Sequence, residues 1–485
     1  MMGMTGTGRY ALALTCVAFA LGGSMTVAGN RFQPAPPAFD RAERKAVADF
    51  WAAEGRYTVG LPADVATQGE WQVRQSPEGS LWLHAYTRAI RGAAKVPPTQ
   101  IATGTTPQQT GWDAWIEAKY AWEEASLRQD ADRRNNRPLT PLADANDPGP
   151  APEDMVKAVG QAPPAFLEVV RPQRHTVKFD DFTADLVDHT KVRRRFAFYR
   201  FREGVMHVGE AMRGRTVEDL KPLFNAAGVS DAELRVMAAV SLLEGGFDSL
   251  NTYDTGFVSV GFIQFASLRD GAGSLGQVMR RMKQDAPQDF QAHFRRFGLD
   301  VTSDGRLIAL DPATGVEFVG AEANTRIILD RRLAAVFHRA GRLSQEFRLA
   351  QIRVCKDMYY PADDEVEFTV GTTSFRGKIS EFVRTEAGMA TLMDRKVNTG
   401  NYGDLIPLLQ SYATTYGFRT LAEFAQAEFQ LVRALQYRKD NQPMDGLSLP
   451  LDLGIAASRG GRAGDRGRPG STGGTGSGGS GRRGR

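Results

Sequence analysis

Long amphipathic segments fill the second half of the chain and limit the folds that it can adopt. They run TRIILDRRLAAVFHRAG from Thr325, SQEFRLAQIRVCKDMYY from Ser344, GKISEFVRTEAGMATLMDRKVN from Gly377 and LAEFAQAEFQLVRALQYRK from Leu421. Apolar residues that recur every three to four positions indicate helices with one buried face. This half of the chain therefore predicts a mainly helical fold.

Short strands and hairpins are expected before and between these helices. HTVKFDDF and RRRFAFYRF, which lie between residues 173 and 210, alternate as strands, and Asp304-Gly305 is a turn signal for a hairpin over 299–319. The sequence contains no alternating strand–helix series and no glycine-rich phosphate loop. We expect a mainly α fold with small β-hairpins, which belongs to the α+β class.

A polar, proline-rich stretch divides the chain. Its 485 residues exceed one ordinary domain, which spans roughly 50 to 250 residues. Residues 129–152 lack periodicity and predict a linker between a small α+β domain at 30–128 and a second domain at 153–440. In the first domain, Ser76-Pro77-Glu78-Gly79 predicts a hairpin that enters a helix. Three tryptophans then follow at helical spacing, which favours core positions over sugar stacking (Trp112, Trp115 and Trp122).

The two ends of the chain differ in composition from the rest. Residues 1–28 combine Arg9 with an apolar run and small residues near Ala28, the pattern of a secretory signal peptide. Residues 441–485 become rich in glycine, serine and arginine and predict a disordered basic tail. No later stretch approaches the roughly 20 apolar residues of a membrane span. We expect a secreted or periplasmic protein without a membrane span.

The charge balance favours an anionic partner such as the cell wall. The formal net charge is +4, and the basic tail concentrates positive charge at one end. A role in solubility alone is the alternative. Arginine- and glycine-rich tails also bind RNA in cytoplasmic proteins, but for an exported protein we expect no nucleic-acid partner. No pattern in the sequence indicates an oligomeric state.

Cysteine and histidine usage predicts neither a disulfide nor a metal site. Once the signal peptide is removed only Cys355 remains, among apolar helix residues, which indicates a buried and unreactive thiol. The six histidines are scattered without metal-ligand spacing (His84, His175, His189, His207, His293 and His338). We expect no metal and no other cofactor.

Residues 230–268 carry the most informative chemical pattern. Ser230 and Glu233 form a capping-box sequence, so a helix should begin at Ser230 and end before Gly245 and Gly246. Glu244 then lies in the last turn, where the partial negative charge of the helix end disfavours a carboxylate. We expect this to raise the pKa of Glu244, as a general acid requires. An exposed glutamate without a catalytic role is the alternative.

The residues after this helix predict a hairpin that carries a second carboxylate. Asn251 and Gly256 can turn the chain around Asp254, and FVSVGFIQF alternates as a short strand. A glutamate at a helix end that faces an aspartate on a hairpin is the paired-carboxylate arrangement of glycoside hydrolysis.

This segment resembles the lysozyme-like superfamily. The order Glu244, Tyr253-Asp254-Thr255-Gly256, Ser259 and Gly261 is similar to phage-type lysozymes, in which a helix-ending acid precedes a Y-x-D-T-x-G hairpin. Two departures are a separation of ten residues from Glu244 to Asp254, one more than in that pattern, and Ser259 in place of threonine. Gly261-Phe262-Ile263-Gln264 is similar to the G-L-M-Q pattern of goose-type lysozymes and lytic transglycosylases.

The resemblance implies a lysozyme-like catalytic domain at 153–440 and two catalytic residues. Glu244 would protonate the glycosidic oxygen, and Asp254 would activate water or stabilise the oxocarbenium-like transition state. Ser259 would help to position the water.

The resemblance also implies sugar-binding residues, namely Asn251, Tyr253 and Gln264. Each of these, like Ser259, has a structural alternative. Asn251 could be a turn residue, Tyr253 a core residue, Ser259 an ordinary strand residue and Gln264 a buried amide paired with the backbone.

Two further carboxylate groups are candidates. Asp248 follows Glu244 by four residues and could be the second carboxylate or could cap a turn. Glu386 and Asp394 could project from one helix toward a cleft, although solvated ion pairs that involve Asp394 and Arg395 are favoured.

The sequence therefore predicts an exported hydrolase or lytic transglycosylase that cleaves β-1,4 bonds of peptidoglycan or a related amino-sugar polymer. One alternative is a chitosanase or chitinase-like hydrolase. Another is a wall-binding protein that keeps a lysozyme-like fold without turnover.

Overall fold

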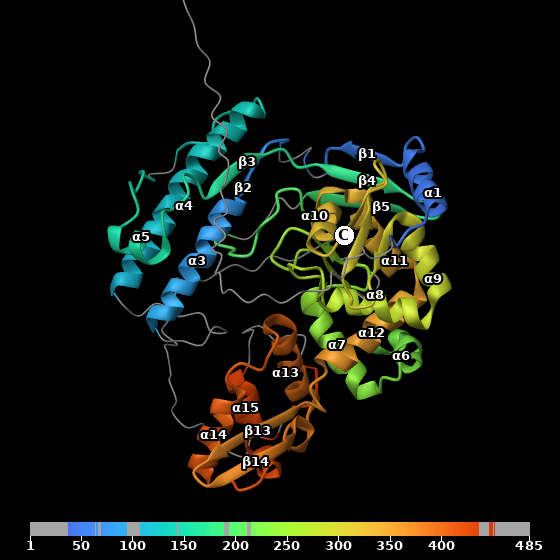
Figure 1. Ribbon diagram of the computed structural model, residues 1–485. Coiled ribbons are helices and arrows are strands. Elements are labelled where there is room, and N and C mark those ends of the chain that lie inside the picture. Colours follow the sequence, from blue (N-terminus) through green and yellow to red (C-terminus); the bar gives the residue numbers. More distant parts are fainter. Residues whose placement is uncertain are drawn as a thin grey trace, which may run out of the picture. The chain divides into compact units, whose positions relative to one another are not determined.

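The computed structural model describes residues 37–63, 65, 69–94, 107–142, 145–188, 194–210, 215–435, 446–449 and 451 (Figure 1). The helices are α1 (Arg41–Ala52), α3 (Pro77–Ala94), α4 (Pro107–Arg134), α5 (Glu153–Val159), α6 (Val217–Ala226), α7 (Asp231–Glu244), α8 (Ser274–Asp285), α9 (Pro287–His293), α10 (Ala321–Leu329), α11 (Arg331–Leu343), α12 (Gln345–Tyr359), α13 (Glu386–Thr399), α14 (Leu405–Tyr416) and α15 (Glu428–Leu435), with 3-10 turns at η1 (Arg295–Phe297), η2 (Ile379–Glu381) and η3 (Leu421–Ala427). The strands are β1 (Tyr57–Gly60), β2 (Gln72–Gln75), β3 (Leu167–Val170), β4 (Arg174–Lys178), β5 (Thr183–Asp188), β6 (Val205–His207), β7 (Leu250–Asn251), β8 (Ser259–Val260), β9 (Phe265–Ala266), β10 (Leu299–Val301), β11 (Leu307–Leu310), β12 (Glu317–Val319), β13 (Glu365–Val370) and β14 (Thr373–Lys378). The predicted α+β class is confirmed.

The largest sheet is antiparallel and ends at the candidate site. Its seven strands follow the order β1-β4-β5-β6-β7-β8-β9, and the pair Met206 and Asn251 joins β6 to β7. The expected hairpin at 299–319 is present as β10 and β11, followed by β12. The short strands β7, β8 and β9 therefore extend a sheet that long-range pairing holds in register.

The predicted linker at 129–152 takes part in the folded structure. α4 continues to Arg134, so the first six positions of that stretch are helical. Thr140 lies beyond the helix, and its backbone N–H donates a 2.7 Å hydrogen bond to Asp132 of α4. β1, which precedes the stretch, pairs with β4, which follows it, and Tyr57 lies opposite Val177. This pairing joins segments on both sides of the stretch, and the division into domains at 30–128 and 153–440 stays a prediction.

A second apolar cluster forms around the aromatic residues of α3 and α4. Trp82 packs on Phe166 with ring centroids 5.3 Å apart, and Trp115 packs on the same ring at 6.0 Å. Trp112 and Trp115 are both buried, which confirms the core assignment for these two, whereas Trp122 is only partly buried.

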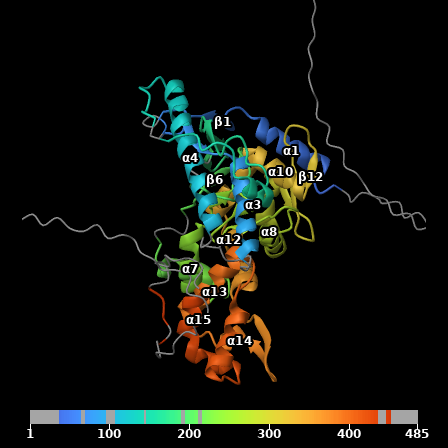
Figure 2. The ribbon, with the colours of Figure 1, turned by 90° about the vertical axis from the view of Figure 1, so that its left-hand side faces the viewer.

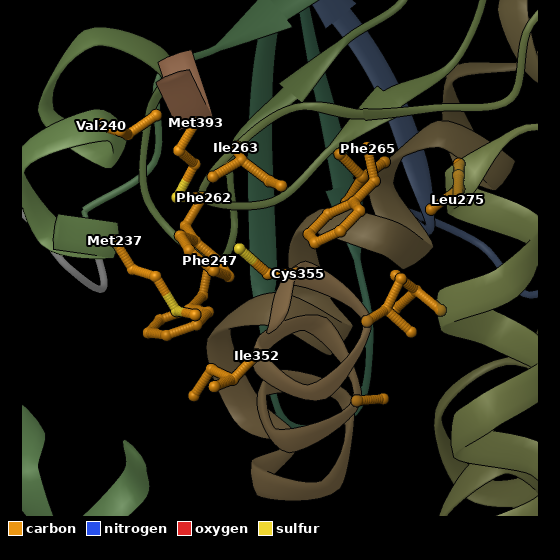
Figure 3. Close-up of a cluster of buried hydrophobic side chains, with 14 of the residues drawn as sticks. Met237, Val240, Phe247, Phe262, Ile263, Phe265, Leu275, Ile352, Cys355 and Met393 are labelled. Carbon is orange, nitrogen blue, oxygen red and sulfur yellow. The ribbon is translucent and has the colours of Figure 1, made fainter. Parts of the chain in front are cut away.

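The main core holds α7 in place. Figure 3 shows Met237 and Val240 of α7, Phe262 after β8, and Met393 of α13 in one buried cluster. All four side chains are fully buried, and each such burial stabilises the fold by roughly 1.5–3 kcal/mol. In both views α13 lies beside α7 (Figures 1 and 2), in agreement with the packing between the two helices. The buried Cys355 belongs to the same core, and burial raises the pKa of its thiol.

Several local predictions were wrong. Ser76-Pro77-Glu78-Gly79 joins β2 to α3 instead of forming a hairpin, because Pro77 opens the helix and β2 pairs with the distant β3. RRRFAFYRF forms no regular strand over its described residues, where Tyr199 makes a single bridge to Asp254. The long segment from Thr325 breaks between α10 and α11, since the side chain of Asp330 caps α11 at the backbone N–H of Arg332.

The two ends are described only in part. The predicted signal peptide at 1–28 lies outside the described residues, as does most of the predicted tail at 441–485. Part of that tail, residues 446–449, lies against α13, where Ser448 Oγ accepts a 2.9 Å hydrogen bond from the backbone N–H of Glu386. Within the described residues, no helix is both long and apolar enough for a membrane span.

Candidate active site

Glu244 lies in the last turn of α7, as the sequence predicts. Ser230 caps the helix, and the reciprocal contact with Glu233 completes the expected capping box. Gly245 ends it with a φ of +153°, a conformation that L side chains rarely adopt. The Glu244 side chain is half-buried. The local sequence thus fixes both ends of the helix and the position of its last carboxylate.

A close approach to the following turn also requires glycine at position 245. A Cβ atom there would lie 2.6 Å from Ser249 Oγ and 3.0 Å from the carbonyl oxygen of Val208. The backbone N–H of Gly245 donates to the carbonyl of Ser241 at 2.8 Å. The helix end is therefore packed tightly on the turn that leads into β7.

Asn398, which the sequence analysis did not identify, contacts Glu244. Its Nδ2 donates to Glu244 Oε1 at 3.4 Å and to Asp394 Oδ1 at 3.1 Å. Asp394 and Asn398 lie one turn apart on α13, so a search of the sequence for polar residues four positions apart could have found this pair. Sequence separation hid their contact with Glu244, because α13 follows α7 by more than 140 residues.

The hairpin residues form a compact hydrogen-bonded loop. Asn251 Nδ2 donates to Asp254 Oδ2 at 2.7 Å, and Asp254 Oδ1 accepts from the backbone N–H of Gly256 at 2.8 Å. Asn251 pairs with Ser259 across β7 and β8. The structure thus brings Asn251, Asp254 and Ser259 together. Asn251 is the last residue of β7, and its Oδ1 accepts a 3.0 Å hydrogen bond from the backbone N–H of Tyr253, which agrees with the turn role given as its alternative.

Burial perturbs the Asp254 carboxyl. Removal from water raises its pKa, and the hydrogen bonds from Gly256 and Asn251 and the charge of Arg200 offset part of that rise. Both carboxyl oxygens have partners within the loop. Asp254 therefore holds the hairpin closed whatever chemistry it performs.

Gln264 connects the hairpin to the turn that follows α7. Its Nε2 donates to Ser249 Oγ at 2.8 Å and to the carbonyl of Gly261 at 3.1 Å. Gln264 has a φ of +56°, and Phe257 and Leu268 in the same segment also have positive φ. Non-glycine residues in this conformation cluster at functional sites.

Tyr253 and Ser259 have mainly internal contacts. The Tyr253 ring lies 6.3 Å from that of Phe196 and 6.0 Å from that of Tyr199, so its half-buried side chain packs in an aromatic group. Ser259 is 5% exposed. These contacts agree with the core and strand alternatives for the two residues.

No family model matches this chain, and no curated protein or solved structure is detectably similar to it. A functional assignment therefore depends on the geometry of the site.

Three side chains that are distant in sequence could hold a metal ion. The ligand atoms of His207, Asp248 and His338 lie within 4.8 Å of one another. Sequence spacing could not reveal this group. Asp248 Oδ2 is also 3.5 Å from Arg342 Nη1, and His207 Nδ1 accepts a 3.0 Å hydrogen bond from the backbone N–H of Gly209, so the group already has partners without an ion.

The same group supports the turn after Glu244. Asp248 is completely buried, and its backbone carbonyl lies 2.8 Å from Nδ1 of His338. This burial removes Asp248 from contact with a polymer, so it does not suit the role of second catalytic carboxylate.

The other carboxylate candidates on α13 have different surroundings. Glu386 pairs with Arg235, at 2.5 Å between Oε1 and Nη2. Asp394 and Arg395 are 1% and 5% exposed, so the predicted solvated ion pairs are wrong for both. Arg395 instead donates to the backbone carbonyls of Tyr402 and Leu435.

Proposed function

We propose that this protein is an exported glycosidase that cleaves β-1,4 bonds of peptidoglycan or a related amino-sugar polymer, with Glu244 as its acid. The observation that carries the proposal is the position of Glu244. It is a half-buried carboxyl at the C-terminal end of α7 that accepts a 3.4 Å hydrogen bond from the Asn398 amide, and the turn that follows α7 bonds to the hairpin through Ser249 and Gln264.

This position suits a proton donor. The carbonyl end of a helix disfavours negative charge, and removal of a carboxyl from water disfavours it further. Glu244 would deliver its proton to the glycosidic oxygen as the bond to the sugar carbon breaks. The Asn398 amide would hold the carboxyl in one orientation during that transfer.

The hairpin supplies the second part of the proposal. Asp254 would activate a water molecule in a hydrolase or stabilise positive charge on the sugar in a transglycosylase. Gln264 and Asn251 would contribute mainly by fixing the shape of the hairpin, since their amide groups bond to Ser249 and Asp254. The sugar contacts implied for Tyr253, Ser259, Asn251 and Gln264 remain part of the proposal.

Digestion of purified peptidoglycan by the mature protein tests the proposal. The wild type should release soluble fragments, and Glu244→Gln should release none at the same concentration. Glu367→Gln, which changes an exposed carboxylate on β13, is the matched control and should digest like the wild type. Mass spectrometry of the fragments separates the reactions, because reducing ends indicate a hydrolase and anhydro ends a transglycosylase.

Other outcomes would redirect or refute the proposal. Digestion of chitosan but not of peptidoglycan would assign the same acid to a glucosamine polymer. Binding to either polymer without any fragments from the folded wild type would refute catalysis and favour a wall-binding protein. Equal activity of wild type and Glu244→Gln would show that Glu244 is not the acid.

A further inference from the structure

Glu244 shares its amide partner with a second, buried carboxyl. Asn398 Nδ2 lies 3.4 Å from Glu244 Oε1 and 3.1 Å from Asp394 Oδ1, so these two oxygens are at most 6.5 Å apart. Asn398 also donates to the Asp394 backbone carbonyl at 2.8 Å, which anchors the amide to α13. The contact therefore joins α7 and α13 through one side chain.

Asp394 is held firmly in this position. It is 1% exposed, and the preceding residue, Met393, packs into the core beside Val240 of α7 (Figure 3). A carboxyl that is buried on this scale cannot contact a polymer in the site. It can still act on Glu244 through its charge, because two carboxylates within 6.5 Å of each other interact even where solvent reaches the contact between them.

We propose that Asp394 is a positioning residue that keeps Glu244 protonated, with Asn398 as the shared amide that orients both groups. The proposal rests on the proposed role of Glu244 as the acid. It adds a carboxyl on α13 to the two carboxyls of the proposed site, Glu244 and Asp254. Negative charge on both carboxyls is unfavourable, so one proton is retained by the pair as the pH rises. Burial disfavours charge on Asp394, but Asn398 bonds more closely to Asp394 Oδ1, at 3.1 Å, than to Glu244 Oε1, at 3.4 Å, which favours charge on Asp394. Where Asp394 carries the charge, the proton of the pair stays on Glu244, which is the more exposed group and can pass it to a substrate.

Asp394 and Asn398 act on the pKa of Glu244 in opposite directions. Asp394 disfavours ionised Glu244 through its charge, whereas the Asn398 N–H favours it through a hydrogen bond. Asp394→Asn should therefore lower the pKa of Glu244, by about one pH unit. Asn398→Ala should raise it. A purely structural role for Asp394 predicts no such reversal between the two variants.

Carbon-13 NMR titration of glutamate carboxyl groups in the full mature chain measures this directly. The Glu244 signal is identified as the one that disappears in Glu244→Gln. The control is Glu386→Gln. Glu386 also lies on α13, but its carboxylate pairs with Arg235, so its removal should leave the Glu244 titration unchanged. In activity assays, the high-pH limb of the kcat profile should move to lower pH in Asp394→Asn and to higher pH in Asn398→Ala.

An unchanged Glu244 titration in folded Asp394→Asn would overturn the inference, and so would a shift of the same sign in both variants. If Asp394→Asn does not fold, Asn398→Ala decides, because a lowered or unchanged pKa of Glu244 contradicts the proposal. The titration needs no substrate. A protein with the expected shifts that digests neither peptidoglycan nor chitosan would refute the proposed function alone, and an active protein without the shifts would refute this inference alone.

Discussion

The side-chain amide of Asn251 donates a 2.7 Å hydrogen bond to Asp254 Oδ2 and accepts a 3.0 Å bond from the backbone N–H of Tyr253. Each atom of this pair therefore has a defined donor or acceptor role. The pair allows the structural and chemical roles of Asp254 to be separated, because the amide and the carboxylate can be exchanged.

We expect Asp254→Asn to lower stability by about 1–3 kcal/mol, since two amide N–H groups would face each other at the loop. The double variant Asn251→Asp/Asp254→Asn restores a donor opposite an acceptor and should recover most of that loss in urea unfolding. If Asp254 acts on water or on the sugar, the double variant stays inactive on peptidoglycan despite its recovered stability.

Recovery of activity together with stability would assign Asp254 a structural role only. If the single variant Asp254→Asn keeps most of the wild-type activity, the hydrolase mechanism is excluded, because an inverting hydrolase needs a base to activate water.

A second prediction concerns the glycine that ends α7. Gly245→Ala should destabilise the protein by about 2 kcal/mol or more, because its φ of +153° is unfavourable for alanine and the new Cβ would lie 2.6 Å from Ser249 Oγ. It should also reduce digestion of peptidoglycan, since the adjacent Glu244 would move. Thermal unfolding and the digestion assay measure the two effects.

Gly92→Ala is the matched control for this substitution. Gly92 lies near the end of α3 with no atom within 4 Å of a built Cβ. Alanine there should stabilise the protein by about 0.5–1 kcal/mol through helix propensity. If Gly245→Ala and Gly92→Ala change the thermal stability equally, the close contact between position 245 and Ser249 does not explain the need for glycine there.

Local patterns predicted the elements around Glu244 well. The Ser230–Glu233 capping box and the glycine after Glu244 fix α7 through contacts within a few residues, so the sequence reveals them. The strands at 299–310 follow the same principle, because the Asp304-Gly305 turn lies between them. Elements whose cause is local were therefore predictable.

Contacts between distant segments were not predictable in this way. Asn398 meets Glu244 only because α13 packs on α7, and His207, Asp248 and His338 meet only through the sheet and α11. The pairing of β1 with β4 likewise joins two segments that lie far apart in the sequence, on either side of the polar stretch at 129–152. These features depend on tertiary packing, for which a single sequence carries no periodic signal.

The pair of histidines beside Asp248, His207 and His338, predicts that the protein loses stability as the pH falls. The ring centroids of His207 and His338 are 4.0 Å apart. Burial, together with the charge of His338, lowers the pKa of His207 to about 4, and burial lowers the pKa of His338 as well. The unfolded chain binds a proton near pH 6.5 that folded His207 does not bind until about pH 4, so the free energy of unfolding falls as the pH drops through this window.

For His207 this loss is about 2 kcal/mol between pH 7.5 and pH 5. His207→Gln should remove it, so the free energy of unfolding in urea should depend less on pH in the variant. The group facing the pair also includes Asp248, Glu210 and Arg342. His84→Gln is the comparison, because His84 is only partly buried and the charges that lower its pKa belong to arginines, so its replacement should alter the slope less. An unchanged slope in His207→Gln would contradict the prediction.

The tryptophans of α4 provide a test of core packing against sugar binding. Trp115 is 8% exposed, packs on Trp82 and Phe166, and donates its indole N–H to the carbonyl of Gly149 at 3.3 Å. Trp115→Ala should therefore cost about 3–5 kcal/mol of stability. Trp122, which is only partly buried under the Lys119 ammonium, is the matched control, and its replacement by alanine should cost far less. If Trp115 served the polymer instead, Trp115→Ala would unfold like the wild type in urea but bind peptidoglycan more weakly in a sedimentation assay.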